Sequence, residues 1–260
     1  MLNGLSQISI ELTNICEKPH ICAMCGHQKD LSTHRGYMEF ELLGKIAKQI
    51  PEGIIVSFHR SGEPTAYTWL WEALNLFDGY ITSLVTHGMN LISKAYEIIN
   101  NCVIITVSVH KNDPDHDEQL SILREFIELK GSLRPIIQVK IVGDMDSSEY
   151  EALEGVRIIR RALHVPQGSH GYVKRQPAIP ESGVCLDLLG KPSINWQGDV
   201  SICNRFDPKG LGVIGNIKNE SLEEIWNGKT RRNILKTHIA GHRELIHACS
   251  KCEFWGVPVG

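Results

Sequence analysis

The stretch QISIELTNICEKPHICAMC, residues 7–25, decides the fold class and carries much of the chemical information in the chain. Its first seven residues, Gln7–Thr13, alternate polar and apolar side chains, which predicts a β-strand with one polar face. Cys16, Cys22 and Cys25 follow directly in one loop, spaced C-x5-C-x2-C. A closed zinc or iron–sulfur site takes four protein ligands, so three cysteines with no fourth nearby predict a cluster with one open iron.

Two other interpretations of this loop stay open: a zinc site completed by His20 or His27, and three unrelated thiols. The chain of 260 residues has eight cysteines, at positions 16, 22, 25, 102, 185, 203, 249 and 252. Its start lacks the charged and apolar regions of a signal peptide, and no apolar run is long enough for a membrane span. We therefore expect a cytoplasmic protein whose cysteines bind metal and do not form disulfides.

The composition is that of an ordinary globular protein, with 42% hydrophobic and 22% charged residues. The 27 basic and 30 acidic residues leave a net charge of −3. This balance gives no general attraction to nucleic acid or to an anionic membrane, so neither is expected as a partner.

Strand-like and helix-like segments alternate over the first 165 residues, which predicts an α/β fold with a parallel sheet covered by helices, open or closed as a barrel. The candidate strands are Gln7–Thr13, Gly53–His59, Ile81–Thr86, Cys102–His110, Ile136–Val142 and Val156–His164. The candidate helices are Glu39–Gln49, Trp69–Phe77, Leu91–Asn100, Asp117–Lys130 and Ser148–Glu154.

The candidate strands are polar on one face, although parallel strands between two helix layers are apolar on both faces. The polar faces carry Ser9, Glu11 and Thr13; Ser57 and His59; Thr106, Ser108 and His110; and Gln138 and Lys140. If helices cover the apolar face, the polar face lines a wet or ligand-filled lumen. The alternative is a sheet that is open to solvent on one side.

A second motif, Ser61-Gly62-Glu63-Pro64, stands at the end of the second candidate strand. A backbone carbonyl edge and an acidic side chain suit a cationic amine, and Gly62 allows close approach. Taken alone, such a tetrapeptide is more often a plain turn. Its place one strand after the cysteine loop favours a binding role.

The last third of the chain differs in composition and pattern from the first 165 residues. Residues 167–180 are rich in Gly, Pro and His and predict a linker, so we expect one domain over residues 1–165 and a second unit over 166–260. Ser193–Trp196 and Val200–Cys203 predict a β-hairpin. The sequence from Ser221 to Glu224 has the form of a capping box that opens a short helix, and Gly228 is expected to close it.

The cysteine loop and the tetrapeptide together resemble the radical S-adenosylmethionine (radical SAM) enzymes. That family places three cysteines after the first strand of a partial (β/α)6 barrel, and its Gly-Gly-Glu-Pro motif binds the amino group of SAM. The first gap here is two residues longer than the family's usual C-x3-C-x2-C, within 17–21. The resemblance implies that SAM is bound by Ser61, Gly62, Glu63, Pro64, His59, Ser108 and Lys140.

The spacing Cys185-x12-Gly198-x4-Cys203, followed by Cys249-x2-Cys252, resembles the SPASM/twitch domains of that superfamily. The resemblance implies a small twitch domain, with a β-hairpin and a helix, that holds one auxiliary [4Fe–4S] cluster, so two such clusters are expected in all. Four thiolates also satisfy zinc, which stays an alternative. Cys102 begins a candidate strand, at the barrel end opposite the usual active site, and is expected to be a buried structural thiol.

Within this group the chain resembles the twitch-domain aminocyclitol (2-deoxy-scyllo-inosamine) dehydrogenase family, notably over 57–64, 107–110 and 224–252. This implies an oxidoreductase that acts on a sugar or aminocyclitol alcohol, with a reducing partner such as flavodoxin or ferredoxin. Peptide modification and sugar epimerisation are rivals within the superfamily. A zinc-stabilised binding module without catalysis is the rival from another class.

Overall fold

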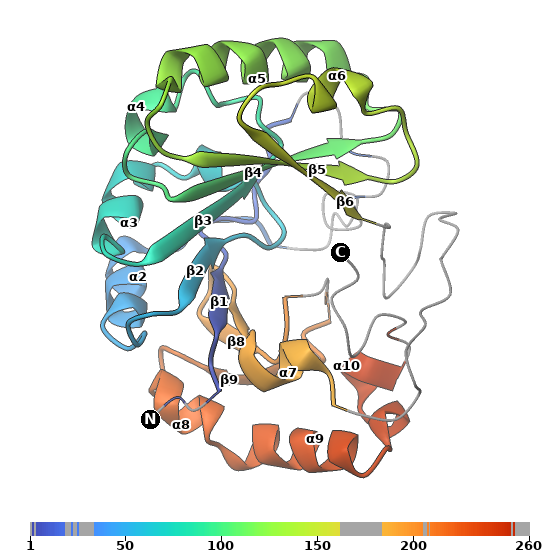
Figure 1. Ribbon diagram of the computed structural model, residues 1–260. Coiled ribbons are helices and arrows are strands. Elements are labelled where there is room, and N and C mark those ends of the chain that lie inside the picture. Colours follow the sequence, from blue (N-terminus) through green and yellow to red (C-terminus); the bar gives the residue numbers. More distant parts are fainter. Residues whose placement is uncertain are drawn as a thin grey trace.

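The computed structural model describes residues 2, 4–18, 22, 25, 34–161, 184–204, 207, 209–250 and 252. Within these residues, a nine-stranded sheet has the order β6-β5-β4-β3-β2-β1-β7-β8-β9 (Figure 1). The first six strands pair in parallel in sequence order, which confirms the expected α/β class and its large parallel sheet.

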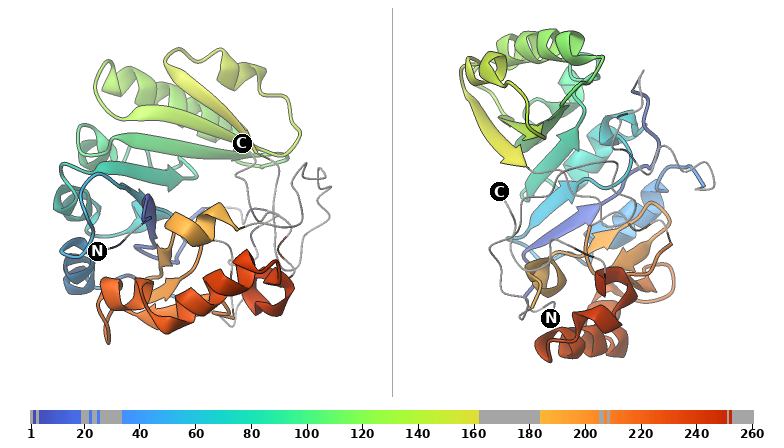
Figure 2. Two further views of the ribbon diagram at one scale, coloured as in Figure 1. Left: turned by 60° about the horizontal axis from the view of Figure 1, so that its bottom comes forward. Right: turned by 90° about the vertical axis from the view of Figure 1, so that its right-hand side faces the viewer.

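The parallel strands are β1 (Gln7–Ile10), β2 (Ile55–Phe58), β3 (Ile81–Thr86), β4 (Ile104–His110), β5 (Ile136–Val142) and β6 (Val156–Arg161). The connecting helices are α2 (Phe40–Ala47), α3 (Leu70–Leu76), α4 (Ala95–Ile98), α5 (His116–Lys130) and α6 (Ser148–Glu151), with a 3-10 turn η1 (Pro64–Ala66). Figures 1 and 2 show these helices on the outer side of a curved sheet. Strand followed by helix and parallel strand is the arrangement that the alternating sequence predicts.

Several expected boundaries move. The first strand ends at Ile10, not Thr13, because Thr13 pairs instead in an isolated antiparallel bridge with Tyr37. The helix expected over Leu91–Asn100 is short: only Ala95–Ile98 is helical, and Asn100 turns the chain with a positive φ of 67°. Strands β3 and β5 have the bounds that their alternation predicts.

The two faces of the sheet differ as expected. The helix-covered face is apolar and buried, and its members include Ile8, Ile10, Val56, Phe58, Leu84, Ile105, Val107, Ile137 and Val139. On the other face Ser9, Ser57 and Ser83 stand side by side across β1, β2 and β3. Ser108 and Lys140 likewise face each other across β4 and β5. The polar row on one face of a curved sheet fits the expected lumen.

The C-terminal part extends the same sheet. Strand β7 (Ser193–Ile194) pairs in parallel with β1, and β8 (Asp199–Ser201) and β9 (Val213–Asn216) continue antiparallel. The helices here are α7 (Leu186–Gly190), α8 (Leu222–Trp226), α9 (Lys229–Ile239) and α10 (His247–Ser250), with a 3-10 turn η2 (Arg243–Leu245). The expected hairpin is confirmed as β7–β8, turning at Gly198 with φ 94°.

The capping box at the start of α8 is confirmed: the Ser221 hydroxyl accepts from Glu224 N, and the Glu224 carboxylate accepts from Ser221 N. The helix ends where Gly228 is expected to close it: Asn227 is its C-cap, Gly228 N donates to Ile225 O at 3.1 Å, and Gly228 is also the N-cap residue of α9. The expected linker and the 165/166 boundary lie outside the described residues. No helix in the described part of the chain is long and apolar enough to cross a membrane.

Candidate functional site

The two N-terminal motifs lie against each other in space. Glu63 N donates a hydrogen bond of 2.8 Å to Ile15 O, at the base of the cysteine loop. A Cβ added to Gly62 would lie 2.3 Å from Thr13 O and 2.7 Å from Ile15 O. Only glycine fits here, because these neighbours are backbone atoms of the residues that lead into Cys16. The Ser61–Pro64 segment therefore supports the cysteine loop directly.

Thr13, and Asn14, which the sequence analysis did not single out, close the neck of this loop. The Asn14 side chain donates to His34 O and accepts from Gly36 N at 2.8 Å. Thr13 Oγ1 donates to Gly36 O, also at 2.8 Å. The segment that enters the loop and the segment that leaves it are thus held together by two side chains that follow β1.

The three loop thiols are close enough to influence one another. Burial raises the pKa of the Cys16 thiol to about 11, and negative charge on Glu63, Cys22 and Cys25 raises it as well. Burial also raises the pKa of Cys22, against the lowering effect of Lys18. Thiols with raised pKa values stay protonated at neutral pH unless metal cations compensate their charge. The donor set therefore fits a metal centre whose cations supply that charge.

Among the described residues, no group of three or more His, Cys, Asp or Glu side chains converges as a single metal ion requires. In a cluster each thiolate binds a different iron, so the sulfurs need not meet at one point. His20 and His27, which would complete a zinc site, lie outside the described residues.

The Glu63 carboxylate is 2% exposed and is held by backbone and hydroxyl donors. Oε1 accepts from Thr65 N at 3.0 Å and from Thr65 Oγ1 at 2.6 Å. Oε2 accepts from His87 N at 2.9 Å and lies 3.4 Å from His87 Nε2. A carboxylate offers about four acceptor positions, so three donors leave room for one more.

The other expected SAM-binding residues lie at the carboxyl ends of β2, β4 and β5. Ser61 N donates to the Glu11 carboxylate at 3.1 Å, and the same carboxylate accepts from Trp196 N at 3.3 Å. Glu11 thereby ties the second motif to the β7–β8 turn. His59, Ser108 and Lys140 are all half-buried, and the last two are opposite each other in register.

Two further groups stand at the carboxyl end of β4. Burial lowers the pKa of His110 to about 4, and the charge on Lys140 lowers it too, so the ring is neutral at physiological pH. The Lys18 ammonium, from the lengthened first gap of the cysteine loop, is buried between the carboxylates of Asp113 and Asp115. Lys18 thus anchors the cysteine loop to the segment after β4.

The four C-terminal cysteines also influence one another. Burial raises the pKa of Cys249 to about 12, and negative charge on Cys203, Cys252 and Cys185 adds to this effect. The Ser193 hydroxyl donates to Cys203 O at 2.7 Å, and Arg243 donates to Cys249 O and Cys252 O. Each of these bonds holds the backbone of a cysteine, and four thiols are the number that a fully ligated cluster takes.

Arg231 holds the helix that follows Cys185, the remaining cysteine of this set. Its guanidinium donates to Leu188 O and Leu189 O, in the helix that follows Cys185. It also stacks 3.4 Å from the centre of the Trp226 ring.

The eighth cysteine, Cys102, is fully buried just before β4, and burial raises its pKa to about 12, which confirms the expectation of a buried thiol.

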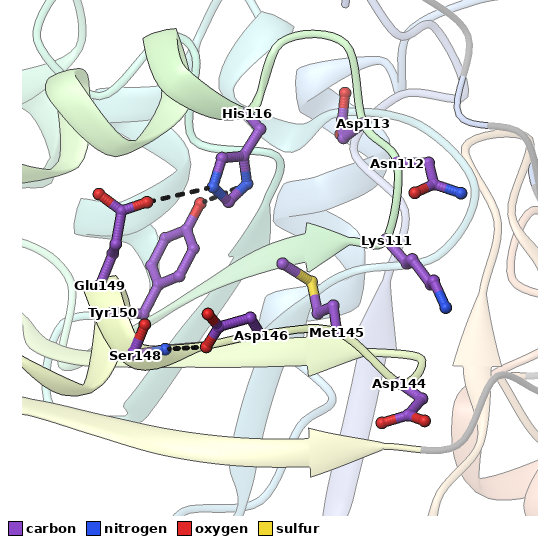
Figure 3. A pocket seen from close by; sticks show the side chains of 10 residues that line it. All are labelled: Lys111, Asn112, Asp113, His116, Asp144, Met145, Asp146, Ser148, Glu149 and Tyr150. Carbon is purple, nitrogen blue, oxygen red and sulfur yellow. Dashed lines mark hydrogen bonds and ion pairs between the residues drawn. The ribbon is translucent and has the colours of Figure 1, made fainter.

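A cavity of about 580 Å³ opens between the segments that follow β4 and β5 (Figure 3). Its lining is Lys111, Asn112, Asp113, His116, Asp144, Met145, Asp146, Ser148, Glu149 and Tyr150. Four of these are carboxylates, and Asp113 belongs both to this lining and to the Lys18 ion pair. The sequence analysis missed this cavity, because its two sides come from separate loops.

Comparison with known proteins gives the family of the C-terminal part. Residues 185–253 match the SPASM family, an iron–sulfur cluster-binding domain. No curated protein sequence matches the chain.

Solved structures match nearly the whole chain. BtrN in complex with AdoMet and 2-DOIA aligns with TM-score 0.60 and 17% identity, over 96% of this chain and 93% of BtrN. The structure of anSMEcpe with bound AdoMet aligns with TM-score 0.63 and 13% identity, over 90% of this chain and 81% of anSMEcpe. Streptococcus suis SuiB bound to S-adenosylmethionine aligns with TM-score 0.62 and 15% identity, over 96% of this chain and 72% of SuiB. At these identities the match shows the fold. The chain thus shares the fold of these three structures, and its residues 185–253 match the SPASM iron–sulfur cluster-binding domain.

Proposed function

We propose that the chain is a radical SAM oxidoreductase that oxidises a small polar substrate, a sugar or aminocyclitol alcohol. One observation carries the proposal. The chain holds two separate cysteine sets, three thiols beside Ser61–Pro64 and four in the SPASM-matching segment. Figure 1 shows α10, which carries Cys249, on the side of the molecule to which β4–β6 point.

The proposed cofactors are two [4Fe–4S] clusters and S-adenosylmethionine. The first cluster is assigned to Cys16, Cys22 and Cys25 and the second to Cys185, Cys203, Cys249 and Cys252. The structural matches to BtrN, anSMEcpe and SuiB, each solved with AdoMet, support the assignment of SAM. When bound, the first cluster and SAM would supply a 5′-deoxyadenosyl radical, the chemistry needed to take a hydrogen atom from an unreactive C–H bond.

The chain's own residues are proposed to bind and orient SAM. The Ser61–Pro64 edge and the remaining acceptor position of Glu63 suit its ammonium group. His59, Ser108 and Lys140 offer polar contacts from the lumen face of β2, β4 and β5. Glu63→Gln keeps the size of the side chain, and we expect it to weaken SAM binding in equilibrium dialysis. Unchanged affinity would show that the segment is only a structural turn.

The absence of a suitable thiol favours oxidation over epimerisation. An alcohol that has lost a hydrogen atom from carbon becomes a ketone by losing one proton and one electron, and an auxiliary cluster is a suitable electron acceptor. An epimerase must instead return a hydrogen atom, for which a free cysteine is a common donor. The eighth cysteine, Cys102, is 0% exposed and lies at the amino end of β4, so it is not placed to serve.

The proposal is tested by metal analysis and product mass. Anaerobically reconstituted protein should hold roughly eight irons, and changing Cys16, Cys22 and Cys25 to Ala should leave roughly four and abolish SAM cleavage. With candidate aminocyclitols, the substrate should lose two hydrogens for each 5′-deoxyadenosine formed. A product of unchanged mass that carries solvent deuterium at carbon would replace oxidation with epimerisation. Stoichiometric zinc without a brown chromophore would overturn the radical mechanism.

Peptide modification is a second candidate, because the SuiB structure solved with its precursor peptide SuiA also matches, with TM-score 0.56 and 15% identity over 86% of this chain and 65% of that one. The same mass assay with peptide substrates separates the two. We further propose residues 1–165 as the barrel domain, residues 166–260 as linker and twitch domain, and a flavodoxin or ferredoxin as reducing partner.

A further inference from the structure

Arg243 holds both cysteines of the last pair through one nitrogen. Its Nη1 donates to Cys249 O at 3.1 Å and to Cys252 O at 2.9 Å. The residue lies in η2, immediately before α10, which carries Cys249. Because one NH2 group spans two carbonyls, the side chain fixes the spacing of the C-x2-C backbone as well as its position.

The same guanidinium brings positive charge to the thiols. Its Nη1 lies within hydrogen-bond distance of the backbone carbonyls of two of the four cysteines, so the charge stands next to the chain that carries their thiols. Arginine remains cationic in proteins, so this charge is present at every working pH. A fixed cation beside four thiolates stabilises whichever state of the site carries more negative charge.

Two titratable groups of the described residues lie near this guanidinium, His238 and Glu244. His238 is fully buried, and its pKa is lowered by burial and by Arg243, so its ring is neutral. Glu244 is exposed, with 59% of its side chain accessible, and lies 3.3 Å from His242 Nδ1. An exposed carboxylate is screened by water, whereas Arg243 is half-buried against the cysteine backbone.

We propose that Arg243 is a positioning residue for the auxiliary cluster and that its charge raises the reduction potential of that cluster. This inference rests on the proposed function, in which the four-cysteine cluster accepts the substrate's electron. The balance is simple: the substrate radical loses one proton to a base and one electron to the cluster, and its C–OH becomes C=O. The reduced cluster carries one more negative charge, which the guanidinium stabilises.

Three variants separate charge from packing. Arg243→Gln removes the charge and leaves a neutral NH2 donor on a shorter side chain. Arg243→Lys keeps the charge but loses the planar guanidinium. Arg232→Gln removes an equal charge from an exposed position on α9 and is the matched control.

The midpoint potential of the auxiliary cluster is measured by EPR-monitored redox titration, with Cys16, Cys22 and Cys25 changed to Ala so that only this cluster remains. We expect a lower potential in Arg243→Gln and values near the parent in Arg243→Lys and Arg232→Gln. An Arg243→Gln protein with four irons and the parent potential overturns the inference. If that variant binds no iron, Arg243→Lys decides: four irons at the parent potential support the inference, and loss of iron or a lowered potential refutes it.

This titration needs no substrate, so its outcome is separate from that of the proposed function. If Arg243→Gln lowers the potential but the parent protein never oxidises a substrate, the role of Arg243 is retained and the dehydrogenase is refuted. In the otherwise unchanged chain, Arg243→Gln should still cleave SAM while forming less oxidised product per 5′-deoxyadenosine. A proportional loss of both would point to a general structural defect and count against the inference.

Discussion

Replacing Gly62 by Ala should separate the second motif from the cysteine loop. The new Cβ would lie 2.3 Å from Thr13 O and 2.7 Å from both Asn14 Cα and Ile15 O. All three neighbours are backbone atoms, so no side-chain rotation relieves the overlap. The segment must open by about 0.7 Å merely to bring the Cβ to 3.0 Å from Thr13 O, a distance that real contacts rarely go below.

The expected cost has two parts. Overpacking in a well-packed region costs about 1–3 kcal/mol. The same opening weakens the 2.8 Å hydrogen bond from Glu63 N to Ile15 O, worth about 1 kcal/mol. The sum of roughly 2–4 kcal/mol lowers the Tm of a chain of this size by roughly 5–15 °C.

Thermal unfolding of the metal-free protein, followed by circular dichroism, measures this cost directly. Gly44→Ala is the matched control, because Gly44 lies inside α2 and its added Cβ meets nothing within 4 Å. Alanine in a helix interior is favoured over glycine by about 0.5–1 kcal/mol, so this variant should be slightly more stable. The Gly62→Ala protein should also retain less iron after reconstitution. Parent-like Tm and iron content in Gly62→Ala would refute the proposed packing of the two motifs.

Two further predictions concern the carboxyl end of β4. Lys18→Met should cost about 3–5 kcal/mol in denaturant unfolding, because it leaves the carboxylates of Asp113 and Asp115 buried without their cation. Lys94→Met, which breaks a partly exposed pair, should cost under about 1 kcal/mol, and equal losses in the two variants would disprove the anchoring role of Lys18. The lowered pKa of His110, about 4 against 6.5, makes its neutral form a source of stability that is complete above pH 6.5 and is lost as pH falls toward 4. His110→Gln should therefore remove about 2 kcal/mol from the drop in unfolding free energy between pH 7 and pH 5, and identical pH profiles would contradict the assigned environment.

Local patterns predicted the sheet well where one face of a strand packs on helices. Ile81–Thr86 and Ile136–Val142 were predicted with their observed bounds, because burial on one face imposes a period of two. The capping box at Ser221 was predictable for a similar reason, since both partners lie within one helical turn. The helix expected over Leu91–Asn100 was too long, because the turn at 91–94 and the positive φ of Asn100 depend on the surrounding packing.

The spacing of the cysteines is sufficient to separate a set of three from a set of four and to show the SPASM/twitch resemblance. The reason is that the type of metal ligand is fixed by the residue type, which can be read directly from the sequence. The contacts that hold these sets depend on the tertiary structure. Lys18 meets Asp113 across 95 positions, Glu11 meets Trp196 across 185, and β7 reaches β1 to extend one sheet. Even the short-range contacts of Arg243 could not be predicted from the sequence, because the path of the chain around α10 decides which two carbonyls it meets. Side-chain chemistry and local periodicity are properties of the sequence, whereas the pairing of distant charges and backbone groups is decided only when burial brings them together.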